Sequence, residues 1–322
     1  MNILFMGSPT FAVPTLQAII RNPEHNVSVI TQPDKPAKRG YQPTPPIIKL
    51  LAQRLKLPVY QLFSLNTPEG IALVKKLQPE LIVVVAFGQI LPDNILNIPA
   101  LGCINLHPSL LPKYRGAAPI QWSLINGDKV TGITVAYITS KLDSGDIILQ
   151  KEVEIEDYDT GSSLSDRLSS SGAMLVMEAI GLIKDGNAPR IPQDETMASY
   201  TSKIRHEDAL IDWQKPARNI FNIVRALNAV PGAYTWVCGE RLKILTAEIV
   251  DTMTSEVLKT SEVCTEIVDD AGTVSDLTKM GPLISTQDGA LLLLEVQPQA
   301  KKPMSGWQFL QGHKWKVGMR LG

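Results

Sequence analysis

The chain has 322 residues, 44% hydrophobic and 20% charged, a mixture that excludes intrinsic disorder and collagen-like fibres and predicts two globular domains. Its 31 basic residues are matched by 32 acidic ones, so no overall positive field attracts nucleic acid, and a polyanion site must come from local clustering. Three widely spaced cysteines, Cys103, Cys238 and Cys264, form no CxxC pair, which argues against a disulfide framework or a cysteine-based zinc site.

Short apolar runs alternate with helix-start signals along the first 107 residues. We expect helices where a hydroxyl residue precedes a proline, at Ser8-Pro9, Thr44-Pro45 and Thr67-Pro68. Strands are predicted at 2–6, 27–31, 59–61, 81–87 and 103–106. This alternation is typical of βαβ units and predicts an α/β fold with a Rossmann-like parallel sheet.

No segment of the sequence has the pattern of a membrane span or a secretory signal. The longest uncharged apolar run, 81–92, is too short to cross a bilayer. The first positive side chain is Arg21, so the N-terminus lacks the basic region of a signal peptide. We therefore expect a soluble protein without a membrane partner, located in the cytoplasm or in an equivalent organellar compartment.

The rest of the chain divides into a long helix, a polar segment and a β-rich region. After strands at 132–138 and 146–155, a helix is predicted over 160–186 with Gly186 at its end. Residues 187–206 are polar and proline-containing, as linkers are, which places one domain at 1–186 and another at 207–322. Short β-rich runs at 234–238, 241–250, 283–285 and 291–296 predict a small antiparallel, OB-like barrel, with an acidic surface hairpin at 262–270.

The first strand ends in a loop that matches neither standard nucleotide-binding pattern. Gly7 is followed by Ser8, Pro9 and Thr10, whereas a dinucleotide fold requires GxGxxG at this point. The P-loop pattern is also absent from the sequence. Nucleotide binding through either loop is therefore disfavoured.

Two polar side chains stand near the end of the strand predicted at 103–106. Asn105 and His107 are two residues apart, so they project from the same face, near the carboxyl edge where open α/β sheets bind ligands. Asp143, in the later turn 142–146, is able to orient an imidazole. From the residues alone, purely structural roles are as plausible as functional ones. His107 would then cap the end of the strand, Asn105 would bond neighbouring backbone, and Asp143 would bond the backbone of its own turn.

Ten segments together give the chain a strong resemblance to the methionyl-tRNA formyltransferase family. The resemblance runs almost from end to end and is carried by GSPTF (7–11), TQPD (31–34), VVAFGQILP (84–92), LGCINLH (101–107), SLLP (109–112), RGAAPIQ (115–121), LDSGD (142–146), IDW (211–213), RALN (225–228) and KKPM (301–304). It implies a formyltransferase catalytic domain at 1–186 and a tRNA-contacting domain at 207–322.

This resemblance implies transfer of a formyl group from 10-formyltetrahydrofolate to the amino group of methionyl initiator tRNA, in translation initiation. Asn105 would stabilise the tetrahedral oxyanion, His107 would act as the base, and Asp143 would orient His107 or a water molecule. No metal is required. The implied folate-binding residues are Phe87, Gly88, Ile90, Leu91, Ser109, Leu110, Leu111 and Pro112.

The implied tRNA contacts are basic residues in two segments. Lys38 and Arg39 lie in a basic loop that matches the family's insertion loop for the acceptor stem, and Lys301 and Lys302 lie in a C-terminal stretch without acidic residues. Composition alone leaves both segments open as solvated surface. No stable protein partner is implied.

Two other functions remain open at this point. One keeps the folate chemistry but changes the acceptor to glycinamide ribonucleotide or an amino sugar, against which the long second domain argues. The other is an RNA-binding module that has lost catalysis, against which the intact Asn105, His107 and Asp143 argue.

Overall fold

The structure is a computed structural model that describes residues 1–37, 42–250 and 270–322. Lys38, Arg39 and Cys264, together with residues 262–269 of the expected acidic hairpin, lie outside the described residues. The chain divides into two compact units. Unit 1 contains Met1–Pro119, Val130–Glu154 and Leu164–Ser202, and unit 2 contains Ile120–Lys129, Ile155–Ser163 and Lys203–Gly322.

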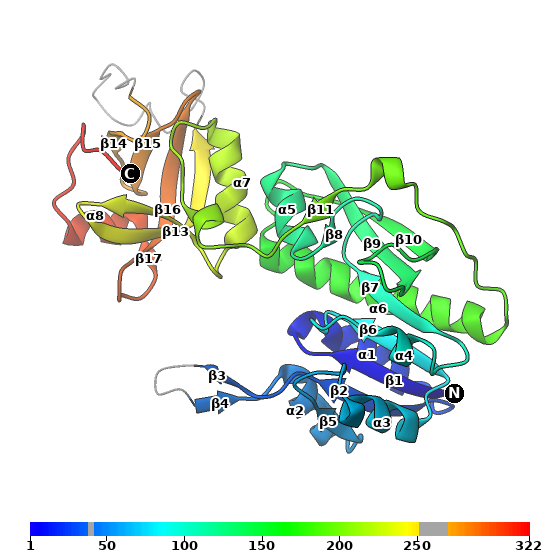
Figure 1. Ribbon diagram of the computed structural model, residues 1–322. Coiled ribbons are helices and arrows are strands. Elements are labelled where there is room, and N and C mark those ends of the chain that lie inside the picture. The colour runs from blue at the N-terminus through cyan, green and yellow to red at the C-terminus, as the bar shows by residue number, and fades with distance from the viewer. Residues whose placement is uncertain (38–41, 251–269) are drawn as a thin grey trace. The chain divides into compact units, whose positions relative to one another are not determined.

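A seven-stranded sheet forms the centre of unit 1 (Figure 1). Its strand order is β10-β9-β7-β6-β1-β2-β5, and the five strands from β7 to β5 are parallel. Because parallel strands are covered on both faces, they are apolar along their length, as in the fully buried Leu81–Val85. The strands are β1 (Asn2–Gly7), β2 (Asn26–Thr31), β5 (Val59–Gln61), β6 (Leu81–Val85), β7 (Cys103–His107), β9 (Val130–Tyr137) and β10 (Ile147–Glu154).

The prediction of an α/β first domain is confirmed, but the sheet is not parallel throughout. β9 runs antiparallel to β7, and β10 runs antiparallel to β9. The segment between β9 and β10 spans only residues 138–146, which is too short for the crossover that parallel strands need. The predicted strand over 81–87 ends at Val85, because Ala86 has a φ of 49° and leaves the extended conformation.

Of the three predicted helix starts, only Thr67-Pro68 is correct. The Thr67 side chain accepts a hydrogen bond from the Gly70 N–H at 3.1 Å and caps the helix. The Ser8 hydroxyl instead accepts from the N–H of Gln32, and the helix after Thr44 begins at Ile47. The helices of unit 1 are α1 (Val13–Ile20), α2 (Ile47–Arg54), α3 (Pro68–Leu77), α4 (Asp93–Leu96) and α6 (Gly161–Lys184, from Leu164 on), with 3-10 turns at Thr10–Ala12 and Glu195–Met197.

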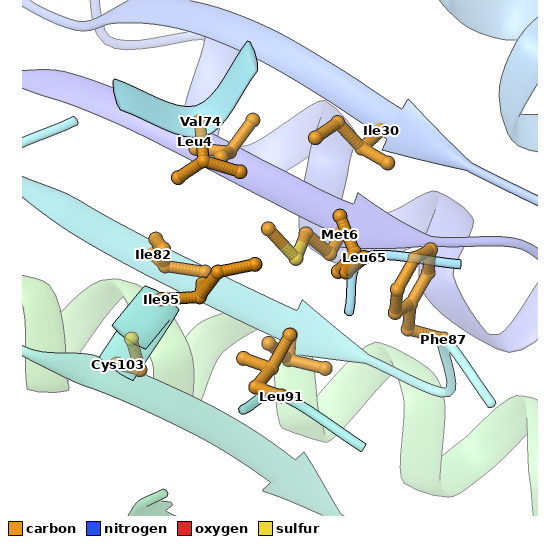
Figure 2. Close-up of a cluster of buried hydrophobic side chains, with 11 residues drawn as sticks. Leu4, Met6, Ile30, Leu65, Val74, Ile82, Phe87, Leu91, Ile95 and Cys103 are labelled. Carbon is orange, nitrogen blue, oxygen red and sulfur yellow. The ribbon is translucent and has the colours of Figure 1, made fainter. Parts of the chain in front are cut away.

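The apolar core of unit 1 packs α3 and α4 against one face of the sheet (Figure 2). Its buried side chains are Leu4, Met6, Ile30, Leu65, Val74, Ile82, Val84, Phe87, Leu91, Ile95 and Cys103. Helix α6 covers the opposite face of β7. A Cβ on Gly172 would stand 2.6 Å from a methyl group of Leu106, so the absence of a side chain there lets the helix approach the strand.

Two short strand pairs lie outside the main sheet. β3 (Lys35–Ala37) pairs antiparallel with β4 (Gln42–Thr44). β8 (Arg115–Gly116) pairs in parallel with β11 (Tyr200–Thr201). The second pair brings the chain after α6 back against the loop that follows β7.

Unit 2 contains an antiparallel sheet in the order β12-β13-β16-β15-β14, with β17 paired to β16. The predicted antiparallel second domain is therefore confirmed. Its strands are β12 (Ala233–Val237), β13 (Glu240–Val250), β14 (Val274–Leu277), β15 (Pro282–Ser285), β16 (Ala290–Pro298) and β17 (Met304–Ser305). Its helices are α5 (Pro119–Ile125, from Ile120 on), α7 (Ala217–Leu227) and α8 (Gly306–Gly312), with a 3-10 turn at Glu207–Ala209. Within the described ranges, no helix is long and apolar enough to cross a membrane.

Candidate active site

Strand β7 places Asn105 and His107 on one face of the sheet. Successive residues of a strand alternate between faces, so these two share the face of Cys103, opposite to Leu106 and helix α6. In the antiparallel register Asn105 lies opposite Ala136 and His107 opposite Thr134. His107 is the last residue of its strand, at the carboxyl edge of the parallel part of the sheet.

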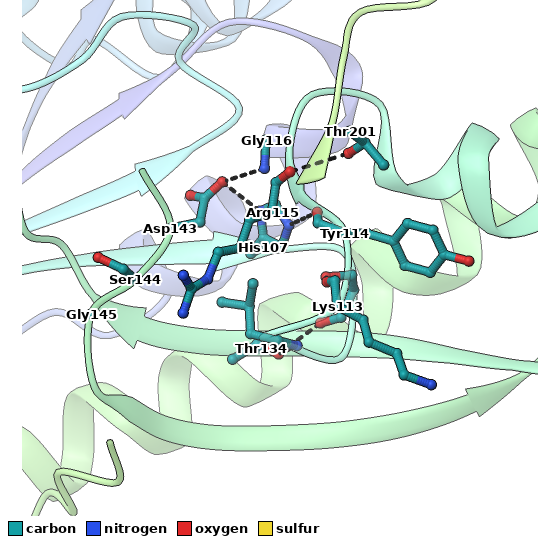
Figure 3. Close-up of polar contacts among 12 residues, drawn as sticks. His107, Lys113, Tyr114, Arg115, Gly116, Thr134, Asp143, Ser144, Gly145 and Thr201 are labelled. Atoms are coloured by element: carbon teal, nitrogen blue, oxygen red, sulfur yellow. Dashed lines mark hydrogen bonds and ion pairs between the residues drawn. The ribbon is translucent and has the colours of Figure 1, made fainter. Parts of the chain in front are cut away.

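The His107 ring is held between a backbone carbonyl and a carboxylate (Figure 3). Its Nε2 lies 2.9 Å from the carbonyl oxygen of Tyr114. Because a carbonyl only accepts hydrogen bonds, Nε2 carries the proton and donates it. In the neutral ring Nδ1 is then the basic nitrogen, and it faces Oδ2 of Asp143 across 3.7 Å.

Asp143 bonds a distant part of the chain rather than its own turn. Its Oδ2 accepts a hydrogen bond from the Gly116 N–H at 2.8 Å, 27 residues away in sequence. The turn is closed by other groups: the Ser144 hydroxyl donates to the Lys141 carbonyl at 3.2 Å and lies 3.1 Å from the Thr139 hydroxyl. Asp143 itself adopts a φ of 47°, a conformation that aspartate tolerates better than most residues. The structure therefore brings Asp143 and His107 together.

Asn105 is half-buried on its strand. No hydrogen bond joins its side chain to another residue within 1–37, 42–250 or 270–322, so the expected alternative of a bond to neighbouring backbone is not seen there. A half-buried amide on an apolar strand is costly unless it finds a partner. Its two N–H donors therefore remain available to a bound molecule on this face.

The loop after β7, residues 108–114, is fixed to the antiparallel edge of the sheet. Thr134 donates to the Ser109 carbonyl at 2.6 Å and accepts from the Leu111 N–H at 3.2 Å. Gln150 adds hydrogen bonds to the Thr134 hydroxyl and to the Leu111 carbonyl. Ser109 and Leu111 are buried, and Leu111 packs with Ala136 and Ile147, whereas Leu110 and Pro112 are partly exposed.

The loop after β6, residues 86–92, leaves the same edge of the sheet beside β7. Gln32 donates to the Phe87 carbonyl at 2.7 Å, and Gln89 bonds the backbone of Leu62 and Leu65. Phe87 is 1% exposed and Ile90 is 75% exposed. Phe87 and Leu91 therefore support the loop from the core, and Gly88 and Ile90 form its surface.

A buried arginine, Arg115, which the sequence reasoning did not single out, binds the segment that follows α6 to the loop after β7. Arg115 is 1% exposed, and its guanidinium donates to both carboxylate oxygens of Glu195, at 2.8 and 3.0 Å. It also donates to the Gln193 side-chain oxygen and to the Tyr200 hydroxyl. The hydrogen bond from Arg115 lowers the pKa of Glu195, and the carboxylate in turn raises the pKa of Arg115.

Gly116, next to this arginine, is a position that no other residue fits well. Its φ is +107°, and a Cβ there would lie 2.4 Å from the Thr201 carbonyl oxygen. The close approach of the two short strands β8 and β11 thus requires glycine. It also aims the Gly116 N–H at Asp143.

Two of the four expected tRNA-binding residues belong to unit 2, and the other two lie outside the described residues. Lys301 and Lys302 are exposed on the turn between β16 and β17 of unit 2. Lys38 and Arg39 fall in the undescribed range 38–41. In the part of the chain that the structure describes, no group of three or more metal-ligating side chains is found.

Two family models match the chain. The one described as "Formyl transferase" matches residues 1–180, and "Formyl transferase, C-terminal domain" matches 203–314. A curated methionyl-tRNA formyltransferase of Syntrophus aciditrophicus is 41% identical over 321 residues, which covers 100% of this chain and 99% of the relative.

Solved structures with lower identity share the fold. HypX from Aquifex aeolicus in complex with tetrahydrofolic acid aligns with a TM-score of 0.65 at 18% identity, and the alignment covers 96% of this chain and 47% of HypX. The chain thus spans about half the length of HypX. An N-formyltransferase from Helicobacter canadensis, in complex with folinic acid and dTDP-3-aminofucose, aligns with a TM-score of 0.64 at 19% identity over 92% of this chain and 98% of that one. These two relatives bind tetrahydrofolate derivatives.

Proposed function

The chain belongs to the methionyl-tRNA formyltransferase family, and on that premise we propose that it transfers a formyl group from 10-formyltetrahydrofolate to the amino group of methionyl initiator tRNA. The observation that carries the proposal is the cluster at the end of β7: an amide without a hydrogen-bond partner among the described residues, an imidazole with a defined basic nitrogen, and a carboxylate facing it. This set of groups suits acyl transfer to an amine.

Asn105 is the proposed oxyanion donor. When an amine nitrogen attacks a formyl carbon, the carbonyl oxygen gains negative charge, and a fixed N–H donor stabilises that charge more than it stabilises the ground state. Strand β7 fixes the backbone of Asn105 between two hydrogen-bonded neighbours, β6 and β9. The backbone from which the donor projects is therefore fixed before the reaction begins.

His107 is the proposed base, acting through Nδ1. The attacking amine must be unprotonated and must lose a proton as its bond to the formyl carbon forms, while the nitrogen of the donor must gain one as its own bond to that carbon breaks. A neutral imidazole is able to accept the first proton and return it to the leaving nitrogen. Because Nε2 is committed to Tyr114, Nδ1 performs this transfer, and Asp143 stabilises the ring while it is charged.

The folate would lie against the two loops that leave the sheet beside Asn105. The co-substrate supplies a formyl carbon already bonded to a nitrogen leaving group. The loops fit a flat, partly apolar ligand, since Gly88, Ile90, Leu110 and Pro112 are at least partly exposed. Phe87, Leu91, Ser109 and Leu111 are buried and hold these surfaces in place.

For the tRNA we propose contacts with Lys38, Arg39, Lys301 and Lys302. Exposed lysine and arginine side chains attract phosphates, and the affinity that they contribute falls with rising salt. Lys301 and Lys302 are exposed, and the Gln297 side chain shapes their turn by donating to the Lys301 carbonyl at 2.9 Å.

The proposal is tested by incubating the protein with 10-formyltetrahydrofolate and each of three acceptors: methionyl initiator tRNA, glycinamide ribonucleotide and an amino sugar nucleotide. We expect formyl-methionine only from the tRNA, detected by mass spectrometry after deacylation, with uncharged tRNA as the control. Formylation of a small amine but not of the tRNA would establish the folate enzyme with another acceptor. Binding of tRNA without transfer to any acceptor would establish a module without catalysis.

A further inference from the structure

The segment 191–201, which we call the strap, forms hydrogen bonds with two segments that contact His107. These are the turn 142–146, which contains Asp143, and the loop 108–114 after β7. Ile191 forms a β-bridge with Ile147 at the start of β10. Farther along, the Arg115 N–H donates to the Ser199 carbonyl at 2.8 Å, and the Tyr114 N–H donates to the Ser199 hydroxyl at 2.8 Å. The strap thus connects the Asp143 turn with the loop whose carbonyl fixes the His107 ring.

Gln193 is the side chain of the strap that makes this connection directly. Its Nε2 donates to the Asp143 carbonyl at 2.8 Å and to the Gly145 carbonyl at 2.7 Å. Its Oε1 accepts from Nε and Nη2 of Arg115, at 3.0 and 2.8 Å. An amide has two N–H donors and an oxygen with two lone pairs, so these four bonds use its full capacity.

The two bonds from Nε2 add to the hydrogen bonds of Ser144 and Gly116 that hold the turn. Asp143 has a φ of 47°, which costs free energy and persists only when the surroundings enforce it. Gln193 grips this turn at residues 143 and 145, while the Asp143 carboxylate points to the Gly116 N–H and to His107. Gln193 therefore holds the backbone on both sides of Ser144, in the turn whose Asp143 carboxylate faces His107.

We propose that Gln193 is a positioning residue for formyl transfer, which fixes the Asp143 carboxylate relative to Nδ1 of His107 by gripping the 143–145 turn. This inference rests on the proposed function. Gln193 is not needed to neutralise Arg115, because Glu195 supplies the negative charge and Tyr200 a further acceptor. Its distinctive contribution is the pair of donors to the turn.

Gln193→Glu separates the two roles of this side chain, which accepts hydrogen bonds from Arg115 and donates hydrogen bonds to the 143–145 turn. The new carboxylate still accepts from Arg115 but has no N–H donors, and its oxygens repel the carbonyls of 143 and 145. We expect kcat to fall on the order of 100-fold, the cost of misplacing a catalytic group by about 1 Å. The KM values for both substrates and the thermal midpoint should stay close to wild type. Gln193→Ala should lower kcat similarly, and Met197→Ala, at an exposed position of the same strap, should leave kcat unchanged.

The combination with Asp143→Ala tests whether Gln193 acts through Asp143. In that background Gln193→Glu should cause no further loss of kcat, because the group that it positions is already gone. A Gln193→Glu variant with wild-type kcat, or losses that multiply in the double variant, would overturn the proposal.

A structural readout separates this inference from the proposed function. If the wild-type protein formylates no acceptor, the function fails, and crystal structures of wild type and Gln193→Glu still decide the role of Gln193. The inference predicts that the distance from Asp143 Oδ2 to His107 Nδ1, 3.7 Å in the native structure, changes by about 1 Å in the variant. An unchanged turn would refute it.

Discussion

The central sheet of unit 1 carries two clusters that are held together by different forces. One is the apolar cluster on the face of β1 and β6, and the other is the polar cluster around His107. Members of the apolar cluster, such as Met6, Ile82 and Ile95, pack by burial, which is not directional (Figure 2). The polar cluster is held by hydrogen bonds of defined direction, such as those of His107 with Tyr114 and of Asp143 with Gly116 (Figure 3).

This difference predicts that the two regions respond differently to substitution. A core tolerates a lost methyl group at a graded cost in free energy of unfolding, because its neighbours relax around the gap. A catalytic cluster loses its function when one group leaves its place, even if the fold is unchanged. Substitutions in the core should therefore affect stability, and substitutions in the polar cluster should affect turnover.

The largest effect is expected for His107→Ala. Removal of a general base costs about 10²–10⁴-fold, so we expect kcat to fall on the order of 1,000-fold. His25→Ala is the matched control, because His25 lies in unit 1 before β2, away from the loops that follow β6 and β7, and should keep wild-type turnover. Turnover of His107→Ala within threefold of wild type would remove this residue from the mechanism.

Ile82→Ala tests the other region. Ile82 is fully buried, and removing its side chain should lower the free energy of unfolding by about 2–5 kcal/mol. Chemical denaturation measures this loss, and kcat per folded molecule should stay within about twofold of wild type. A variant with unchanged stability but reduced kcat would contradict the separation between the two regions.

A smaller, pH-dependent effect is expected for Glu195→Gln. The hydrogen bond from Arg115 lowers the pKa of Glu195, so the ionised carboxylate stabilises the folded chain above its ordinary pKa of about 4.3. That stabilisation is lost as the pH falls through the lowered value in the folded state. Wild type should exceed the variant in stability near neutral pH, and urea denaturation should show the gap closing below about pH 4. The side chain is 68% exposed, so the gap should be small, and a gap that widens in acid would refute the assignment.

Much of the fold follows from local patterns in the sequence. The run Leu81–Val85 predicts a buried parallel strand because every residue is apolar, and Gly186 ends α6 as expected, with a φ of 70° and a bond from the Asn187 N–H to the Leu182 carbonyl. The antiparallel direction of β10 was not predicted, although its short connection to β9, residues 138–146, indicates it, and the direction of β9 relative to β7 has no comparable local signal. The prediction of a helix start at Ser8 was wrong, since its hydroxyl accepts a hydrogen bond from Gln32, just after β2, rather than capping a helix.

The site was predictable only in part. Asn105 and His107 share a strand, so their spacing places them on one face, and the family resemblance, now confirmed, marked them as functional. The hydrogen bonds of Arg115 with Glu195 and of Asp143 with Gly116 could not be predicted, because the bonded residues are 80 and 27 positions apart in the sequence. The polar composition of 187–206 indicated a linker, and nothing in it showed that Gln193 bonds the Asp143 turn.

The most direct test of the account is the single-turnover rate of formyl transfer by Asn105→Ala, with both substrates saturating and folate affinity measured separately. Loss of an oxyanion donor typically costs about 10²–10³-fold, so we predict a fall of this size while folate affinity stays within a few fold of wild type. Asn26→Ala, which removes an amide at the start of β2, should transfer at the wild-type rate. A rate for Asn105→Ala within threefold of wild type would contradict the central claim.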